Sequence, residues 1–143
     1  MEDVCSIHGG KSSWWMVLWT ATIFHLARTE ETIRIVIEPQ NPTAGSDVWF
    51  NPPTVPNHIV FCSWYRQSSP PERMREIGTR YRLPTEGTSR GASYSGREDI
   101  HPNCSLSIHK VTRFDSVKYQ LREGAPGVLY VGDARLTVSD STR

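Results

Sequence analysis

Arg97, Asp115 and Tyr119 constrain the fold more than any other residues of this 143-residue chain. They lie in that order within the stretch from Tyr94 to Leu121, and a short alternating apolar run separates the arginine from the aspartate. A guanidinium and a carboxylate can form a two-pronged ion pair. Alternation with a period of two predicts a strand. We therefore expect Arg97 and Asp115 to pair around the two ends of one strand.

Tyr119 and Trp64 narrow the fold class further. A tyrosine shortly after the aspartate has the placement of the tyrosine corner near the start of strand F in an immunoglobulin sandwich. Trp64 lies in the most β-prone run of the chain, 59–67, which fits the buried tryptophan of strand C. The alternative is an ordinary core tryptophan of another sandwich. We predict an all-β, antiparallel immunoglobulin sandwich of the variable type, in which Trp64, Arg97, Asp115 and Tyr119 are structural.

The predicted strands are short, about nine in number, and separated by turn residues. Those with the clearest pattern cover 32–38, 48–50, 59–67, 77–83, 95–100, 105–110, 118–122 and 128–138. The strand at 77–83 carries Arg80 and Arg82, which we interpret as solvated arginines that protect a sheet edge. The segment 84–91 is expected to be a loop.

The N-terminal segment has the composition of a targeting sequence. Trp14 to Ala27 is a mostly apolar run of the length of a signal-peptide core, and Lys11 precedes it. We expect a signal peptide over about 1–31, an immunoglobulin domain over 32–139 and a C-terminal end at 140–143. A short membrane anchor or a buried strand is the alternative. No second apolar run follows, so we expect a mature chain without a membrane span.

Several function classes receive no support from the sequence. Lys and Arg number 16 against 15 Asp and Glu, which does not favour nucleic acid as a partner. His58, His101 and His109 lack metal-ligand spacing, so we expect no metal and no cofactor. No nucleophile or phosphate-loop motif is present, and we expect a chain that is not an enzyme. Arginines are frequent between Arg66 and Arg90. Solvated side chains are the favoured explanation there, and a sulfated-glycan site is the alternative.

Three segments carry a family resemblance: HIVFCSWYRQ, YSGREDIHPNCSLSI and FDSVKYQL. They resemble the N-terminal variable-type domain of the carcinoembryonic antigen-related cell adhesion molecules (CEACAM) and the related pregnancy-specific glycoproteins. The likeness runs from about Ile33 to Val138. It implies a domain without the usual disulfide between strands B and F. Leu121 stands at the strand F position, and the strand B position is expected near Pro52.

The resemblance also implies a function and a face. It implies an extracellular protein-recognition module for cell adhesion or immune-modulatory binding, secreted, or held at the cell surface if other isoforms carry an anchor. The implied partners are extracellular or cell-surface proteins, with self-association less favoured because Arg80 and Arg82 dilute the apolar character. A secreted matrix component, a soluble decoy and a truncated isoform of a larger adhesion protein are alternatives. The face formed by strands C, C′, F and G would bind through Tyr65, Ser63, Val60, Ile77 and, more weakly, Gln67.

Tyr65 is the first choice as an anchor on that face, because aromatic side chains dominate interface energetics.

Two further sites depart from the family or depend on it. Cys62 and Cys104 stand where an aromatic residue and an alanine are usual, and we expect two buried free thiols, with a Cys62–Cys104 disulfide as the less favoured alternative. Asn103 begins an Asn-Cys-Ser sequon, for which N-glycosylation and an unmodified turn asparagine are equally favoured.

Overall fold

The computed structural model describes residues 29–54, 58–68 and 73–140, and its strands form two sheets packed face to face. The larger sheet contains β1 (Thr29–Thr32), β4 (Phe61–Ser68), β5 (Arg73–Tyr81), β6 (Gly87–Arg90), β9 (Lys118–Ala125) and β10 (Val128–Arg135). The smaller sheet contains β2 (Val36–Glu38), β3 (Val48–Asn51), β7 (Glu98–Ile100) and β8 (Leu106–Ile108). A 3-10 turn, Arg113–Asp115, leads into β9.

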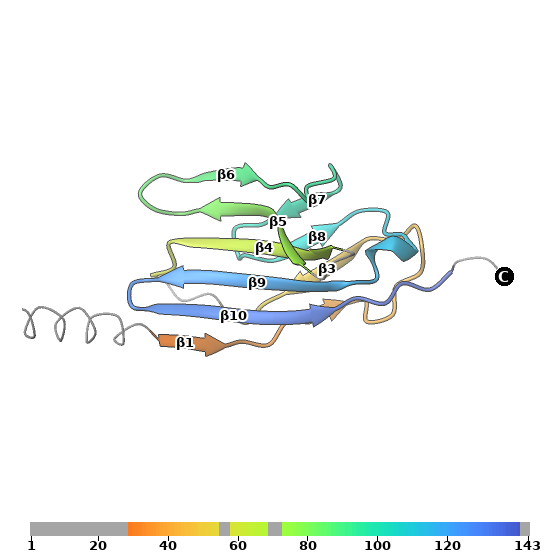
Figure 1. Cartoon of the computed structure of the whole chain (residues 1–143), viewed down its shortest axis with the longest axis horizontal. Coiled ribbons are helices and arrows are strands. Elements are labelled where there is room, and N and C mark those ends of the chain that lie inside the picture. The colour runs from red at the N-terminus through yellow and green to blue at the C-terminus, as the bar shows by residue number, and fades with distance from the viewer. Residues whose placement is uncertain (1–28, 55–57, 69–72, 141–143) are drawn as a thin grey trace, which may run out of the picture.

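The strand order is that of a variable-type immunoglobulin domain. It is β1-β10-β9-β4-β5-β6 in the larger sheet and β2-β3-β8-β7 in the smaller one (Figure 1). The pair β1–β10 is parallel and the other pairs are antiparallel. The two strands after β4, which extend the larger sheet, distinguish the variable type from the constant type. The predicted fold class is confirmed.

The prediction for 77–91 is wrong in two respects. β5 begins at Arg73 and pairs with β4 on one side and β6 on the other, so it is not an edge strand. The edge strand is β6, within the segment predicted as a loop. Its sequence, Gly-Thr-Ser-Arg, has no apolar alternation. Pairing with β5 makes it a strand, and that pairing leaves no signal in the local sequence.

The predicted first strand, 32–38, is divided between the two sheets. β1 pairs with β10, Ile33 donates its amide to the Val131 carbonyl at 2.9 Å, and β2 then pairs with β3. Ile33, Ile35 and Ile37 pack against the core along this crossing. β1 starts at Thr29, ahead of the predicted domain start. The rest of the predicted signal peptide and the last three residues of the predicted C-terminal end lie outside the described residues.

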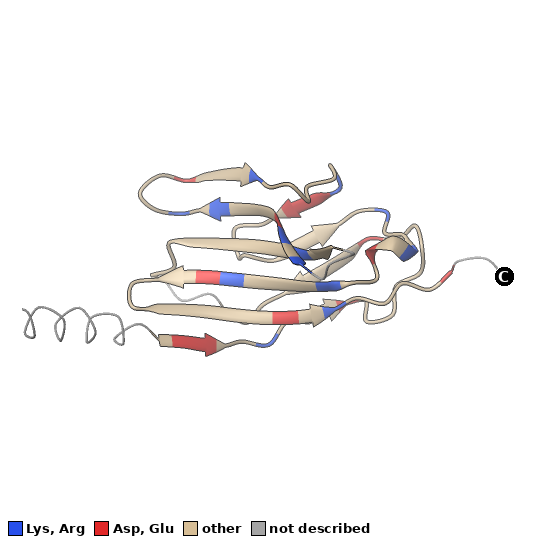
Figure 2. Cartoon of the chain, in the orientation of Figure 1, with Lys and Arg blue, Asp and Glu red and all other residues tan. Residues whose placement is uncertain are grey.

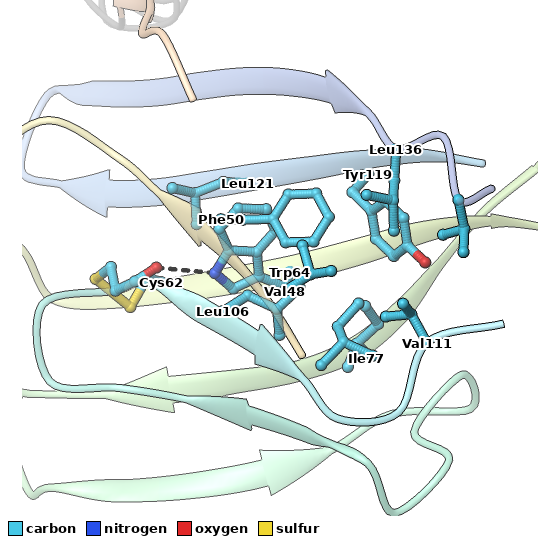
Figure 3. Packing of buried hydrophobic residues seen from close by; sticks show 13 residues of the cluster. Val48, Phe50, Cys62, Trp64, Ile77, Leu106, Val111, Tyr119, Leu121 and Leu136 are labelled. Carbon is cyan, nitrogen blue, oxygen red and sulfur yellow. Dashed lines mark hydrogen bonds between the residues drawn. A yellow bond between two sulfur atoms is a disulfide. The ribbon is translucent and has the colours of Figure 1, made fainter. Parts of the chain in front are cut away.

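Trp64 lies at the centre of the core between the sheets, as predicted. It is fully buried, and Phe50 packs against it with ring centroids 5.7 Å apart and against Tyr119 at 4.8 Å (Figure 3). Tilted aromatic pairs of this kind contribute about 0.5–1.5 kcal/mol beyond the area they bury. The buried apolar residues around them are Val48, Cys62, Ile77, Cys104, Leu106, Ile108, Val111, Leu121, Leu136 and Val138.

The usual disulfide between strands B and F is absent, as predicted, because neither β3 nor β9 contains a cysteine. Leu121 is buried at the strand F position. The expected strand B position near Pro52 is wrong, since β3 ends at Asn51 and its buried side chains are Val48 and Phe50. Phe50 therefore occupies the inner side of strand B, where it packs on Trp64.

A different disulfide joins the two sheets. Cys62 on β4 is bonded to Cys104, which precedes β8, and their Cα atoms are 5.9 Å apart (Figure 3). The expectation of two free thiols is therefore wrong. Alternation in the sequence indicates that Cys62 faces the core, but it gives no distance to Cys104. The turn before β8, where Cys104 has a φ of 69°, brings the second sulfur within bonding range.

Side chains from β4, from β5 and from the residue after β5 also bind the end of β7 and the turn that follows it. Three of them donate to alternate backbone carbonyls: Arg80 to Ile100 at 3.3 Å, Arg82 to Pro102 at 3.0 Å and Trp64 to Cys104 at 2.8 Å. The interpretation of the two arginines as solvated edge residues is therefore wrong. Arg80 satisfies a carbonyl at the end of β7 and Arg82 satisfies one in the turn that follows, so both help to hold the two sheets together.

Asp115, fully buried at the end of the 3-10 turn, pairs with Arg97 as predicted. Arg97 donates to both carboxylate oxygens at 2.9 Å. Tyr119 donates its hydroxyl to the Asp115 carbonyl at 3.0 Å, which is the predicted tyrosine corner. Burial raises the pKa of Tyr119, so the hydroxyl keeps its proton.

Arg66 is a second arginine that pairs with Asp115. The sequence-based interpretation of Arg66 as a solvated arginine is therefore wrong. Its Nη1 donates to Asp115 Oδ1 at 2.6 Å and to the Tyr119 hydroxyl at 2.8 Å, and its Nη2 donates to the Phe114 carbonyl at 2.6 Å. We call Arg66, Arg97, Asp115 and Tyr119 the Asp115 latch. It joins β4, the start of β7 and the start of β9 at one end of the sandwich.

Candidate functional site

The outer face of the larger sheet, the side away from the core, is the candidate binding surface. Side chains alternate across a strand, so the neighbours of the buried Trp64 and Leu121 point to this face. The register of β10, β9, β4 and β5 arranges them in three rows. These are Leu129, Gly124, Phe61 and Tyr81; then Val131, Arg122, Ser63 and Thr79; then Asp133, Gln120, Tyr65 and Glu76.

The first row is apolar and partly open. The ring of Phe61 lies over Gly124 so closely that a Cβ at this glycine would overlap it. Tyr81, the next residue in the row, keeps 43% of its surface exposed. Glycine on β9 therefore makes room for an aromatic side chain from β4, which adds apolar surface to the face.

The third row carries Tyr65 under a fixed arginine. The Arg122 guanidinium lies over the Tyr65 ring, 5.1 Å from its centroid, and its Nε donates to Gln120 at 2.9 Å. Gln120 in turn donates to Asp133 at 2.9 Å. An arginine stacked on an aromatic ring leaves guanidinium N–H groups available for a carboxylate or carbonyl of a partner.

The five residues predicted for this face separate into two groups. Tyr65 and Gln67 lie on it and are partly exposed, and Ser63 lies on it but is only 4% exposed and shares a hydrogen bond with Thr79 at 2.6 Å. Val60 lies just before β4. Its backbone amide donates to the Gly124 carbonyl, and its carbonyl accepts from the Arg82 amide. Ile77 is 1% exposed and belongs to the core (Figure 3).

The position of Ile77 has a specific cause. The register between β4 and β5 shifts after Trp64, so that Trp64 is opposite Gly78 and Tyr65 is opposite Glu76. Ile77 is the extra residue of this bulge, and its side chain turns into the core. Its prediction as a binding residue is therefore wrong. Sequence reasoning also missed Phe61, Tyr81 and Arg122, and alternation along β4 was a signal only for Phe61.

Glu123 is a buried carboxyl on the inner side of β9. It is 2% exposed, and its Oε2 has no hydrogen-bond partner within the described part of the chain. Its cross-strand neighbour on β4 is Cys62. Burial raises the pKa of Glu123 to about 7, and the charge of Arg82 opposes this shift only in part.

We expect Glu123→Gln to stabilise the domain at pH 8. Between pH 4.5 and about 7 the native state holds a proton that the unfolded chain releases, so the free energy of unfolding falls as pH rises through this window. The variant should lack this fall and gain roughly 2–3 kcal/mol at pH 8, with little difference at pH 4. Urea unfolding at both pH values measures it. The exposed Glu86→Gln is the control, and an equal gain for it would contradict the assignment.

Two of the histidines, His101 and His109, lie beside aromatic or acidic side chains. His101 stacks on Trp49 with centroids 4.5 Å apart, and His109 lies between Asp47 and Asp99 at 3.3 and 3.4 Å. Among the described residues no three His, Cys, Asp or Glu side chains are grouped to hold a metal ion. Acidic and basic positions are interspersed along β9 and β10 (Figure 2).

Comparisons with known proteins agree with this architecture, although no protein-family model matches the chain. The chain is 29% identical over 103 residues to the mouse cell adhesion molecule CEACAM16 and 28% identical to its rat counterpart. Each match covers 71% of this chain but only 23% of that protein, so the chain spans about a quarter of these relatives. Both relatives are named as cell adhesion molecules, not as enzymes.

Two solved structures share the fold. Murine CEACAM1b superposes with a TM-score of 0.65 at 23% identity, over 78% of this chain and 55% of that one. A structure of the mouse coronavirus receptor-binding domain complexed with its murine receptor gives a TM-score of 0.67 at 21% identity, with the same coverage. Within the described ranges, no helix is long and apolar enough to cross a membrane. On the strand order and these similarities, the chain contains a CEACAM-like immunoglobulin domain.

Proposed function

We propose that this chain is an extracellular protein-recognition module that serves cell adhesion or immune-modulatory binding through the outer face of the larger sheet. The observation that carries the proposal is the set of aromatic side chains on that face. Phe61, Tyr65 and Tyr81 lie on adjacent strands, and Arg122 lies over Tyr65. Aromatic and arginine side chains are enriched at the centres of protein interfaces.

The two curated relatives, named as cell adhesion molecules, support the same class of function. A protein partner is further supported by the structural neighbour whose receptor is complexed with a viral domain. The partner proposed for this chain is an extracellular or cell-surface protein. A second copy of the chain is one such partner, and the test below distinguishes it from others.

Tyr65→Ala and Tyr81→Ala are expected to weaken binding at least tenfold, because truncating a central aromatic residue removes about 1.4 kcal/mol or more. Binding of the oligomerised full chain to a panel of cell-surface proteins measures heterophilic recognition. Sedimentation of the free chain over a range of concentrations measures self-association. Both variants leave the core and the disulfide intact.

Trp49→Ala is the control on the opposite sheet. Trp49 is 40% exposed and alternates with the buried Val48 and Phe50, so it faces away from the proposed surface. Binding is expected to survive this change. Loss of binding on Trp49→Ala, with Tyr65→Ala and Tyr81→Ala unaffected, would assign recognition to the smaller sheet instead.

A further inference from the structure

The turn between β7 and β8 holds a sequon and a disulfide in adjacent residues. Asn103 is exposed, whereas Cys104 and Ser105 are fully buried. The side-chain oxygen of Asn103 accepts hydrogen bonds from the Ser105 amide at 3.1 Å and the Ser105 hydroxyl at 2.7 Å. The sulfur of Cys104 is bonded to Cys62. All three residues of the sequon are therefore engaged in the native turn.

The closed turn is a poor substrate for N-glycosylation. The modification requires the asparagine together with the serine two residues later, so the enzyme must reach both side chains. In the native turn the Ser105 hydroxyl is buried and already donates to Asn103. The transferase can reach this pair only while the turn is open.

Opening the turn in the native domain would break several interactions at once. Cys104 is bonded to Cys62, its carbonyl accepts from the Trp64 indole at 2.8 Å, and its amide donates to the His101 carbonyl at 2.8 Å. His101 also donates its amide to the Ser105 carbonyl at 2.9 Å. The disulfide is the only covalent bond among these interactions, so its formation is the step that makes closure of the turn stable.

The native turn nevertheless has room for a glycan that is already attached. Both hydrogen bonds to the Asn103 side chain use Oδ1, and the sugar would be carried by Nδ2. Because Asn103 is exposed, the glycan can extend into solvent without displacing the buried Cys104 or Ser105. A glycan that is attached before closure is thus compatible with the native turn. After closure, the transferase can no longer attach one.

We propose that Asn103 is a glycosylation site whose occupancy is set by competition with closure of the Cys62–Cys104 disulfide. In one reaction the Asn103 Nδ2 loses a proton and bonds to the first sugar of a lipid-linked oligosaccharide, and the lipid pyrophosphate leaves. In the other the two thiols give up two protons and two electrons to an oxidised dithiol protein. The inference rests on the proposed extracellular function, because both reactions take place in the secretory pathway, through which an extracellular protein passes.

The test is glycan occupancy at Asn103 in the full chain expressed in secretory cells, measured by mass spectrometry on total cellular and secreted protein. We expect wild-type occupancy to be partial and Cys62→Ser, which leaves the sequon unchanged, to raise it at least twofold. Brief treatment of cells with a thiol reductant should raise wild-type occupancy in the same way. Full occupancy of the wild type, or no rise with Cys62→Ser, would overturn the inference.

Two controls separate the explanations. Leu121→Ala destabilises the core but keeps both cysteines, so it should leave occupancy near the wild-type value. A rise equal to that of Cys62→Ser would show that slow folding, not the disulfide, decides occupancy. Glu86→Asn creates an Asn-Gly-Thr sequon at exposed position 86. If position 86 is not glycosylated, both the proposed extracellular function and this inference are refuted. If position 86 is glycosylated but the occupancy of Asn103 does not respond to Cys62→Ser, only the inference is refuted.

Discussion

Replacing Asp115 by alanine is expected to lower the free energy of unfolding by about 3–5 kcal/mol, the cost of breaking a buried charge pair by removing one partner. Asp115 is 1% exposed and is the shared acceptor of Arg66 and Arg97. It also accepts from the Thr112 amide at 2.8 Å and so caps the 3-10 turn. The loss would leave two guanidiniums and one amide without their acceptor. Urea unfolding at pH 7 measures it.

The arginine variants distinguish this latch from a simple pair. Arg66→Ala and Arg97→Ala should each cost roughly 2–3 kcal/mol, since each removes hydrogen bonds to a buried charge. Arg113→Ala is the matched control, because its contact with Asp140 is long, at 3.5 Å, and exposed. We expect a change within about 0.5 kcal/mol for it. A loss at Arg97 alone, with Arg66→Ala resembling the control, would contradict the shared latch.

The latch also predicts behaviour in acid. The two arginines and the Thr112 amide lower the pKa of Asp115 to about 2, against the opposing effect of burial. The unfolded chain therefore takes up a proton at higher pH than the native state does, and the stabilisation is complete above pH 4. It should be lost as pH falls from 4 to 2, by about 2 kcal/mol. Asp115→Asn should show no such loss when unfolding is followed over the same range.

Removing the Cys62–Cys104 disulfide is the second change with a large expected effect. The bond closes a loop between residues 42 positions apart, and a loop of this length corresponds to roughly 4 kcal/mol in the chain-entropy treatment. We expect the double variant Cys62→Ala, Cys104→Ala to lose about 2–4 kcal/mol, the typical contribution of a disulfide. Thermal and urea unfolding of both proteins measures the difference.

A reductant supplies the control for this change. It should move the wild-type unfolding transition close to that of the double variant and leave the variant itself unchanged. Trp64→Phe, which removes the indole hydrogen bond to Cys104 but keeps the disulfide, should stay sensitive to reductant. A wild-type transition that reductant does not alter, under conditions that reduce the bond in the unfolded chain, would show that the core alone holds the two sheets together.

The sequence by itself determined the fold class and three of the four latch residues, all but Arg66. Strand alternation, Trp64, and the order Arg97, Asp115, Tyr119 are local or nearly local patterns, and they predicted the variable-type sandwich. Period-two alternation also assigned Tyr65 to the outer face correctly. These features depend on which side of a strand a residue occupies, which the sequence records directly.

Only the tertiary structure decided the features that depend on register and distance. The bulge after Trp64 moves Ile77 into the core, and the strand character of β6 comes from its pairing with β5. Arg66 reaches Asp115 across 49 positions, and Cys62 meets Cys104 across 42. One residue more or less in a register changes the face of every side chain beyond it, and a local pattern carries no information about such long-range distances.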